Sequence, residues 1–424
     1  MRFTQFLINA LKNRMVARPS PGQIILPRPQ DSLRDYPSAG LTPSRLSAIL
    51  READDGSLSS TMQLFEEMEE KDAHLFAVAN TRRLAVTGLE WSVVSAADLH
   101  HVAERRAADE AADYCRESLF RLDDVDQVLQ HLSLAVGRNI ALAELVWEVI
   151  DGTLTLVDLA PVDFTRLVFD ERDQVRVLTD DEPQHGVALP PHKFIVHTPH
   201  SVSGHPQRGG LLRVTAMTYL AKNLALKDWL VFAEVFGMPV RIARYEPSAT
   251  PEEKRELLRM LETLGSNAAG IFSRAVELQI VEANRGTSGP PYEKLIEFLN
   301  REMSKAWLGQ TLTTDVSGQK GTLTATAIHE QVRQDVLADD LRKEARTIRR
   351  DLLTPLTRLR FGPDAPVPYF RRKLKPPASP RELAELIDVA VNRLGAKVSA
   401  AWAHDALGLP QSAASEAVLS GAAR

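Results

Sequence analysis

A long, largely apolar helical pattern from Leu211 to Phe236 constrains this chain more than any other feature. Gly209-Gly210 precedes the pattern, and Gly237-Met238-Pro239 ends it, because glycine favours a helix C-cap and proline cannot continue a helix. The apolar residues leave little of the helix surface polar. The pattern therefore predicts a helix that needs other protein on most of its sides.

The order of elements after this helix is equally specific. We predict a compact βαβ unit, then a helix, a polar loop and a second long helix. The segments are Val240–Tyr245 (strand), Pro251–Leu264 (helix), 270–272 and Glu277–Val281 (strands), Pro291–Leu308 (helix), 309–322 (loop) and Leu323–Leu353 (helix). About 31 residues at 1.5 Å each span roughly 46 Å, which is more than one small domain needs. Pro355 is expected to end or kink the last helix.

The first half of the chain mixes helices and strands and predicts an α+β region. Five prolines within the first forty residues predict an extended arm that orders only against a partner. Helices are expected from Thr42-Pro43, over 59–87, up to about residue 120 and over 125–135. Strands are expected at 89–94, 141–149, 154–160, 165–169, 175–179 and 193–197, with Asp151-Gly152 as a hairpin turn. Two terminal helices, 381–394 and 399–406, follow a proline-rich segment.

Composition excludes several classes of protein. The single cysteine, Cys115, excludes a disulfide scaffold and cysteine-ligated zinc or iron–sulfur centres. Apolar stretches such as 140–149 meet charges at Glu144 and Glu148 well before the roughly 20 residues of a membrane span. We expect no signal peptide. A length of 424 residues gives a prior of two or three domains.

Charge is unevenly distributed behind the net value of −5. The segment from Arg51 to Asp72 contains eight acidic and two basic residues. The segment from Leu341 to Lys375 contains eleven basic and three acidic residues. Such asymmetry indicates either a surface for nucleic acid or an acidic partner, or solvated helix faces with internal ion pairs. In an assembling protein the two signs can also complement each other between copies.

The sequence offers no convincing active site. His192, His197, His200 and His205 have spacings of 5, 3 and 5 residues, which do not suit a metal site. The segment 318–322 has lysine before glycine and follows a helix, so it is not a Walker loop. Glu66, Glu69 and Glu70 share a helix face, but no histidine joins them at the spacing of bundle metal sites. We therefore expect no catalytic residue, no metal and no cofactor, and a structural or mechanical role.

Several strings, in order, resemble the Mu-type bacteriophage portal proteins. They are Ala39-Gly40-Leu41-Thr42-Pro43-Ser44-Arg45-Leu46, Met68-Glu69-Glu70-Lys71-Asp72-Ala73-His74-Leu75-Phe76, Thr81-Arg82-Arg83, Glu90-Trp91, Phe236-Gly237-Met238-Pro239-Val240-Arg241, Leu308-Gly309-Gln310-Thr311-Leu312-Thr313-Thr314 and His329-Glu330-Gln331-Val332-Arg333. They extend from about residue 39 to 360, with Gly408-Leu409-Pro410 as a weaker match in the tail. Each string alone would be weak, whereas their shared order makes the resemblance specific.

The resemblance implies the portal fold: a wing, a helical stem, a small α/β clip and a helical crown, assembled as a ring that commonly has twelve subunits. Projected onto this chain, the parts are 1–40 (extended arm), 41–209 (α+β wing), 210–236 (stem helix), 237–289 (clip), 290–308 (stem helix), 309–322 (tunnel loop), 323–378 (long wing helix and return segment) and 379–424 (crown). The ring sits at one capsid vertex, and double-stranded DNA enters and leaves through it.

The implied partners are other copies of the chain, double-stranded DNA, the terminase large subunit, head-completion and tail adaptor proteins, and the major capsid protein, with no membrane. The implied location is the virion, after assembly in the host cytoplasm. The implied channel-lining residues lie in the tunnel loop and are Gln310, Thr313, Thr314, Ser317, Gln319 and Lys320. Two alternatives stay open: a head–tail adaptor without a translocation role, and an enzyme that acts on DNA.

Overall fold

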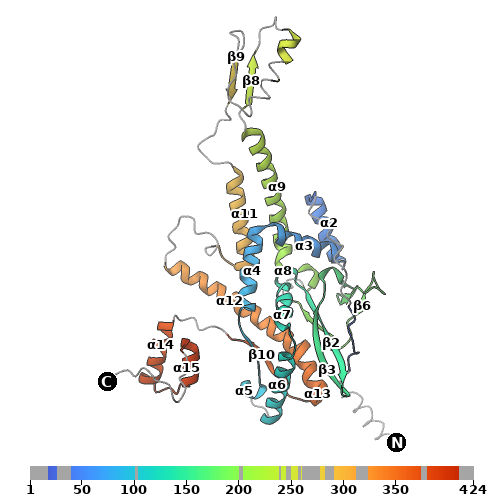
Figure 1. Ribbon diagram of the computed structural model, residues 1–424, viewed down its shortest axis with the longest axis vertical. Coiled ribbons are helices and arrows are strands. Elements are labelled where there is room, and N and C mark those ends of the chain that lie inside the picture. The colour runs from blue at the N-terminus through green and yellow to red at the C-terminus, as the bar shows by residue number, and fades with distance from the viewer. Residues whose placement is uncertain are drawn as a thin grey trace. The chain divides into compact units, whose positions relative to one another are not determined.

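The computed structural model describes residues 18–25, 40–100, 104–199, 204–237, 240–244, 250–255, 259, 277–281, 291–311, 323–373 and 380–409 (Figure 1). The chain divides into two compact units. Unit 1 comprises Met1–Gly88 and Val93–Arg371, and unit 2 comprises Leu89–Ser92 and Arg372–Arg424. Both helices and sheets are present, so the predicted α+β class is confirmed.

Unit 1 begins with three helices, α2 (Pro43–Asp54), α3 (Ser59–Lys71) and α4 (Ala73–Thr87). The predicted Thr42 cap is present, because its side chain accepts a hydrogen bond from the backbone N–H of Arg45. The prediction of one helix over 59–87 is wrong. Asp72 has an extended backbone and caps α4 by accepting hydrogen bonds from the N–H groups of His74 and Leu75.

A three-stranded antiparallel sheet, in the order β3-β2-β7, forms the centre of the α+β part. The strands are β2 (Ala141–Ile150), β3 (Thr153–Pro161) and β7 (Phe194–His197). Asp151 and Gly152 both have positive φ, 49° and 75°, as the predicted tight hairpin requires. A smaller sheet contains β4 (Leu167–Phe169), β5 (Val175–Val177) and β6 (Val187–Ala188), the last of which was not predicted.

Further helices lie in this half of the chain, and α7 among them packs on β2 and β3. They are α5 (Ala96–Leu99), α6 (Arg105–Phe120), α7 (Val125–Ser133), α8 (Ala135–Arg138), η2 (Phe164–Arg166) and η3 (Pro206–Arg208).

The described part of the N-terminal arm packs on its own chain. The Gly22 N–H donates to the carbonyl of Trp147, and Ile25 belongs to the core. The Glu144 carboxylate accepts hydrogen bonds from the N–H groups of Ile24 and Ile25, and the Lys193 ammonium donates to the Gly22 carbonyl. The expectation that the arm orders only against a partner is therefore wrong for residues 18–25.

Two helices form an antiparallel hairpin, here called the α9–α11 hairpin: α9 (Leu211–Gly237) and α11 (Pro291–Leu308) (Figure 1). The predicted bounds of both are confirmed to within a residue. Beyond them lie β8 (Val240–Arg244) and β9 (Glu277–Val281), which pair antiparallel. A βαβ unit implies parallel strands, so this part of the prediction is wrong for the described pair. The expected strand at 270–272 lies outside the described residues, as does much of the expected helix 251–264.

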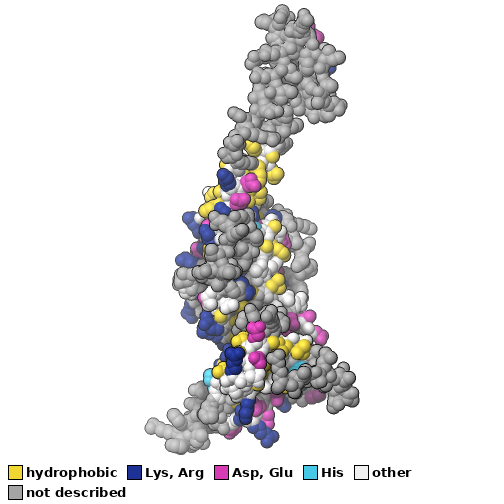
Figure 2. All heavy atoms as spheres, turned by 90° about the vertical axis from the view of Figure 1, so that its left-hand side faces the viewer, with side chains coloured by type: hydrophobic (Ala, Val, Ile, Leu, Met, Phe, Trp, Pro, Cys, Tyr) yellow, Lys and Arg dark blue, Asp and Glu magenta, His cyan; other side chains and the backbone are white. Residues whose placement is uncertain are grey.

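The described part of the hairpin exposes large apolar side chains next to charged ones (Figure 2). Within the described ranges, no helix is long and apolar enough to cross a bilayer.

The helix after the loop is longer than predicted. It comprises α12 (Leu323–Ile348), a π-helical turn η4 (Arg349–Leu353) and α13 (Thr354–Phe361). A π-helical turn leaves a carbonyl without its usual helical partner, and the Thr354 hydroxyl donates to the Arg349 carbonyl at 2.7 Å. The turn precedes Pro355, so the helix passes the proline rather than ending at 353.

Unit 2 contains α14 (Pro380–Asp388), a second π-helical turn η5 (Val389–Arg393) and α15 (Ala400–Leu407). The prediction of two terminal helices is confirmed. Strands β1 (Trp91–Val94) and β10 (Tyr369–Arg372) form a two-stranded sheet.

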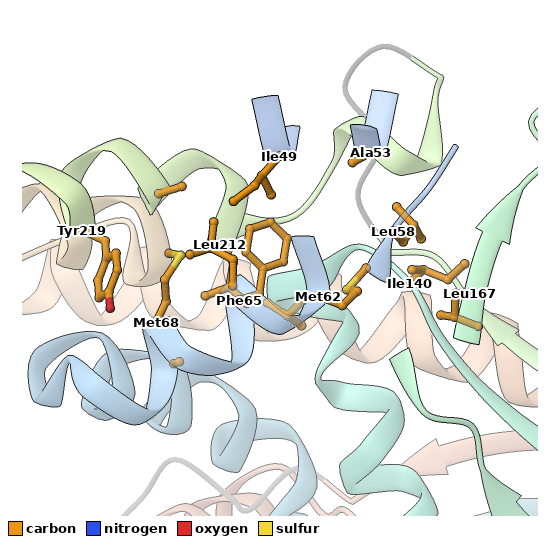
Figure 3. Packing of buried hydrophobic residues seen from close by; sticks show 14 of the residues in the cluster. Ile49, Ala53, Leu58, Met62, Phe65, Met68, Ile140, Leu167, Leu212 and Tyr219 are labelled. Atoms are coloured by element: carbon orange, nitrogen blue, oxygen red, sulfur yellow. The ribbon is translucent and has the colours of Figure 1, made fainter. Parts of the chain in front are cut away.

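Unit 1 contains a large cluster of buried apolar side chains, part of which Figure 3 shows. It brings together α2, α3, β-strand residues and the lower halves of α9 and α11. Its members include Ile49, Met62, Phe65, Met68, Ile140, Leu167, Leu212, Tyr219 and Trp307. The core therefore fixes the lower half of the α9–α11 hairpin on the α+β part.

Candidate functional site: a buried ion network that joins α11 to α12

The loop 309–322 begins where α11 ends. Gly309 has a φ of 69° and donates its N–H to the Lys305 carbonyl, the usual geometry of a glycine that terminates a helix. Gln310 is 4% exposed, so its side chain is shielded. The other five predicted lining residues, Thr313, Thr314, Ser317, Gln319 and Lys320, lie outside the described residues.

Arg82 on α4 joins the two helices that flank this loop. Its Nε and Nη2 lie 2.9 and 3.0 Å from the two carboxylate oxygens of Asp340 on α12. Its Nη1 donates to the Trp307 carbonyl, in the last turn of α11, at 2.9 Å. Such a bidentate, charge-assisted contact has a strict geometry. The Arg82 side chain is 10% exposed and that of Asp340 is 5% exposed, so water competes little for the pair.

Two residues at the start of α4, Asp72 and His74, each contact one helix of the α9–α11 hairpin. Asp72 accepts a hydrogen bond at 2.7 Å from the ammonium group of Lys222, which is buried on α9. His74 Nε2 lies 2.8 Å from the hydroxyl oxygen of Ser304 on α11. Burial, together with the charge of Lys222, lowers the pKa of His74 below its ordinary value. A neutral imidazole therefore makes this contact.

Glu69 on α3 lies between two buried arginines. Its carboxylate accepts hydrogen bonds from Arg83 on α4 and, at 2.7 Å, from Arg138 on α8. Burial alone would raise the pKa of Glu69, but Arg138 and Arg83 outweigh it, so its pKa lies below the ordinary value. The carboxylate is thus ionised and bridges three helices.

These residues form what we call the α4 ion network: Glu69, Asp72, His74, Arg82, Arg83, Arg138, Lys222, Ser304 and Asp340. It connects α3, α4, α8 and α9 with α11 and α12, the two helices that flank the loop in sequence. Its groups are ion pairs and hydrogen bonds rather than an arrangement of a nucleophile with a base. The network is suited to holding helices in place.

Comparison with known proteins shows the family. A family model described as the portal protein of Mu bacteriophage matches residues 62–409. The chain belongs to this portal family. It is 30% identical over 393 residues to the Mu-like prophage FluMu protein gp29 of Haemophilus influenzae (strain ATCC 51907 / DSM 11121 / KW20 / Rd), covering 91% of this chain and 74% of that protein. It is 29% identical over 387 residues to the portal protein of Escherichia phage Mu, with the same two coverages.

Solved structures support the portal fold. The neck of an empty gene transfer agent (GTA) particle gives a TM-score of 0.53 at 14% identity, covering 80% of this chain and 91% of that one. The virion of the native particle gives 0.51 at 13% identity, covering 87% and 94%. At such identities the likeness concerns the fold. It confirms that the helices and sheets are arranged as in neck proteins of such particles.

The residues that carry the sequence resemblance to the portal family also build the ion network. The strings at 68–76 and 81–83 supply Glu69, Asp72, His74, Arg82 and Arg83. Sequence reasoning assessed this helix only for metal ligands and missed the ion pairs. The sequence signal that could have indicated these ion pairs was the presence of charged residues on otherwise apolar helices, because a buried charge needs a partner. The partners are up to 258 residues away in sequence, so they could not be named in advance.

The two described histidines of the 192–205 group that make side-chain contacts bind elsewhere. Nδ1 of His197 lies 2.9 Å from the Thr347 hydroxyl oxygen, and Nδ1 of His205 lies 2.8 Å from Asp173. In the described part of the chain, no group of three histidine, cysteine or acidic side chains could hold a metal ion. Burial raises the pKa of the Cys115 thiol to about 11, so it is unreactive at neutral pH.

Proposed function

We propose that this portal-family chain forms the ring at one capsid vertex of a tailed phage, through which double-stranded DNA is packaged and ejected. The observation that carries the proposal is the α9–α11 hairpin, fixed at its lower end by the ion network, with β8 and β9 between the two helices in sequence and residues 309–322 following α11. In this proposal the segment with β8 and β9 is the clip, α9 and α11 form the stem, residues 309–322 are the tunnel loop and α12 is the long wing helix. The domain boundaries given above belong to the same proposal, with the arm at 1–40 and the crown at 379–424.

The loop 309–322 would line the narrowest part of the channel. DNA must pass without being held, and many phosphate contacts would bind it tightly. Thr313, Thr314, Ser317 and Gln319 offer weak, interchangeable hydrogen bonds, and Lys320 adds one positive charge per subunit. Because Gln310 is buried, it supports the start of the loop in this proposal, and the other five residues face the DNA.

The proposed partners are other copies of the chain, twelve in the ring, and the DNA. The terminase large subunit would dock during packaging, head-completion and tail adaptor proteins would replace it, and the major capsid protein would surround the ring. The neck of a native GTA particle was computed with C12 symmetry, which supports a twelvefold ring by analogy. The chain would reside in the virion, after assembly in the host cytoplasm, and would act without enzymatic activity.

Imaging of the purified full chain tests the proposal. We expect rings with a central hole of about 20 Å or more, the width of a DNA duplex, and Lys320 near the channel wall. Lys320 more than two Debye lengths, roughly 16 Å at physiological salt, from the wall would overturn its assignment.

Particle assembly separates this function from that of an adaptor. When this chain is not produced, we expect phage heads that contain no DNA, because the ring through which DNA would enter is missing. Filled heads that leak would indicate an adaptor instead. ATP- or metal-dependent cleavage of DNA by the purified protein would support an enzyme.

A further inference from the structure

The side of α12 that packs on α4 and β7 is polar. The buried side chains between residues 331 and 347 are Asp340, Glu344 and Thr347. Their spacings of four and three residues place them on one face of the helix. Within this described stretch no apolar side chain is buried, and partly exposed ones, such as Val332 beside Gly309, add limited apolar contact. Polar groups therefore make up the buried face of α12.

The two helices of the hairpin are held by different means. Both contribute large side chains to the apolar cluster: Leu212, Ala216, Tyr219 and Leu220 from α9, and Met303, Trp307 and Leu308 from α11. Separating either helix from the cluster would expose this surface to water, at a cost in free energy that grows with the apolar area exposed. The lower half of the hairpin is therefore expected to stay in place as long as unit 1 is folded.

Polar contacts hold the α12 face at two points. Asp340 pairs with Arg82 on α4, and the Thr347 hydroxyl oxygen lies 2.9 Å from Nδ1 of His197 on β7. Beside these contacts is a cavity of about 20 Å³, which has room for one water molecule. Its polar lining comes from both sides of the interface: Arg82, Arg83, Ser133, His197, Asp340 and Glu344. The interface thus lacks the close apolar packing of the hairpin base.

An interface of this kind costs little free energy to separate. When a buried ion pair forms, the loss of hydration offsets most of the attraction, and on separation both charges regain water. Parts of a protein with few buried apolar contacts open locally, at free energies below that of global unfolding. We therefore expect residues 331–347 to separate from α4 and β7 while α9 and α11 remain in the apolar cluster.

The π-helical turn η4 marks the lower end of this stretch. From residue 348 to 356 the buried side chains are apolar, namely Ile348, Leu352, Leu353, Pro355 and Leu356. The Asp351 carboxylate also accepts the Val196 N–H on β7 at 2.9 Å. Sharp bends in helices occur at π-helical turns, among a few other causes. The helix is thus fixed from η4 onward and has a natural place to bend at η4.

We propose that the part of α12 before residue 348 is a lever that opens from α4 about η4 as one unit, with Arg82 and Asp340 as its latch. Arg82 suits this role because it stays bound to the Trp307 carbonyl when Asp340 leaves. Residues 309–322 join α11 to α12, so the lever would change the separation that this segment spans in the proposed channel. That consequence rests on the proposed function, whereas the opening itself does not.

Hydrogen–deuterium exchange of the full chain, read by mass spectrometry, tests the opening. Amides in a helix exchange when the structure around them opens, so their protection reports the population of the open state. After correction for sequence, we expect residues 331–347 to exchange at least about tenfold faster than 212–220 on α9 and 299–307 on α11. This comparison needs no substitution.

Asp340→Asn tests the latch, because it removes the charge with little change of shape. We expect it to speed exchange of 331–347 by a further factor of about ten, and to change exchange of 212–220 and 299–307 by less than about twofold. Asp339→Asn is the matched control. Asp339 is the neighbouring acid on the same helix, but its ion pairs with Arg342 and Lys343 lie within α12. We expect it to change exchange of 331–347 by less than about twofold.

Three results would overturn the inference. Equal protection of 331–347 and the hairpin ranges in the unmutated chain would mean that α12 opens only when unit 1 unfolds. Equal acceleration by Asp340→Asn and Asp339→Asn would mean that the helix frays by itself. Loss of protection in the hairpin ranges of Asp340→Asn would mean that the pair supports the core and is no latch. Exchange is measured whether or not rings form, so its result and that of the ring imaging are decided separately.

Discussion

At the scale of single residues, buried ion pairs set geometry more than they add stability. Lys193 and Glu144 are both fully buried, 3.4 Å apart, and hold the backbone of residues 22–25. Removing water from both charges offsets most of their attraction, whereas removing one partner costs about 3–5 kcal/mol. The pair therefore favours one position of the arm over others. Asp72 and Lys222 restrict α9 in the same way.

His131 gives the fold a calculable sensitivity to acid. Its Nε2–H donates to the Leu142 carbonyl at 3.1 Å, and its ring stacks on Phe164. Burial, assisted by the charge of Arg138, lowers the pKa of His131 to about 4 from 6.5. Below pH 6.5 the unfolded chain binds a proton that the folded chain does not. Stability from this group is full above pH 6.5 and falls by roughly 3 kcal/mol as the pH approaches 4.

Substitution of this histidine checks the assignment. In His131→Phe the ring is kept, and the Leu142 carbonyl still accepts the N–H of Val162 at 3.0 Å. We expect the thermal unfolding midpoint of the variant to fall less between pH 7 and pH 4.5 than that of the unmutated chain. An equal fall in both proteins would show that other groups cause the acid sensitivity.

At the scale of elements, features fixed by neighbouring residues could be predicted from the sequence. The Thr42 cap, the Asp151-Gly152 turn and the bounds of the α9–α11 hairpin depend on local backbone chemistry. The failures depend on distant partners. Asp72 breaks the predicted helix 59–87 and at the same time binds Lys222 on α9, 150 residues away.

The candidate site could be predicted only in part for the same reason, because its contacts join residues that are far apart in sequence. Sequence alone located the loop 309–322 between two helices, but it could not reveal that Arg82 joins Trp307 to Asp340. The π-helical turn before Pro355 was also missed, because it relies on contacts such as Asp351 accepting the N–H of Val196 on β7. Pattern and caps thus predict elements, and charges from different elements decide how these are joined.

Gly137 on α8 allows a test of how tightly the hairpin base is packed. An added Cβ would lie 2.9 Å from Leu212 on α9 and from the fully buried indole of Trp307 on α11. Helix propensity alone predicts that Gly137→Ala stabilises the chain by about 0.5–1 kcal/mol. Overpacking predicts the opposite sign, a loss of about 1–3 kcal/mol. We expect the loss, measured as a lower free energy of unfolding in urea; a gain would contradict the tight packing.

At the scale of the whole molecule, the length gave a prior of two or three domains, and the chain divides into two compact units. Within unit 1, one apolar cluster collects residues from Ile25 to Leu308, so the hairpin returns to the same cluster after the β8–β9 segment. Unit 2 contributes little to burial: among its described residues, Leu383 is the one buried apolar side chain.

This division predicts that unit 1 keeps its stability without the C-terminal segment. A chain that ends at Lys373 retains the hydrogen bonds from Arg372 and Lys373 to the carbonyls of Leu89 and Glu90. Because the buried cluster is unchanged, its thermal midpoint should stay within about 2 °C of that of the full chain, where 1 kcal/mol corresponds to roughly 2–4 °C. The truncated chain should also form the rings of the proposed function, since α9 and α11 remain complete. A fall of more than about 5 °C, or loss of the rings, would mean that residues 374–424 stabilise unit 1 or the contact between copies.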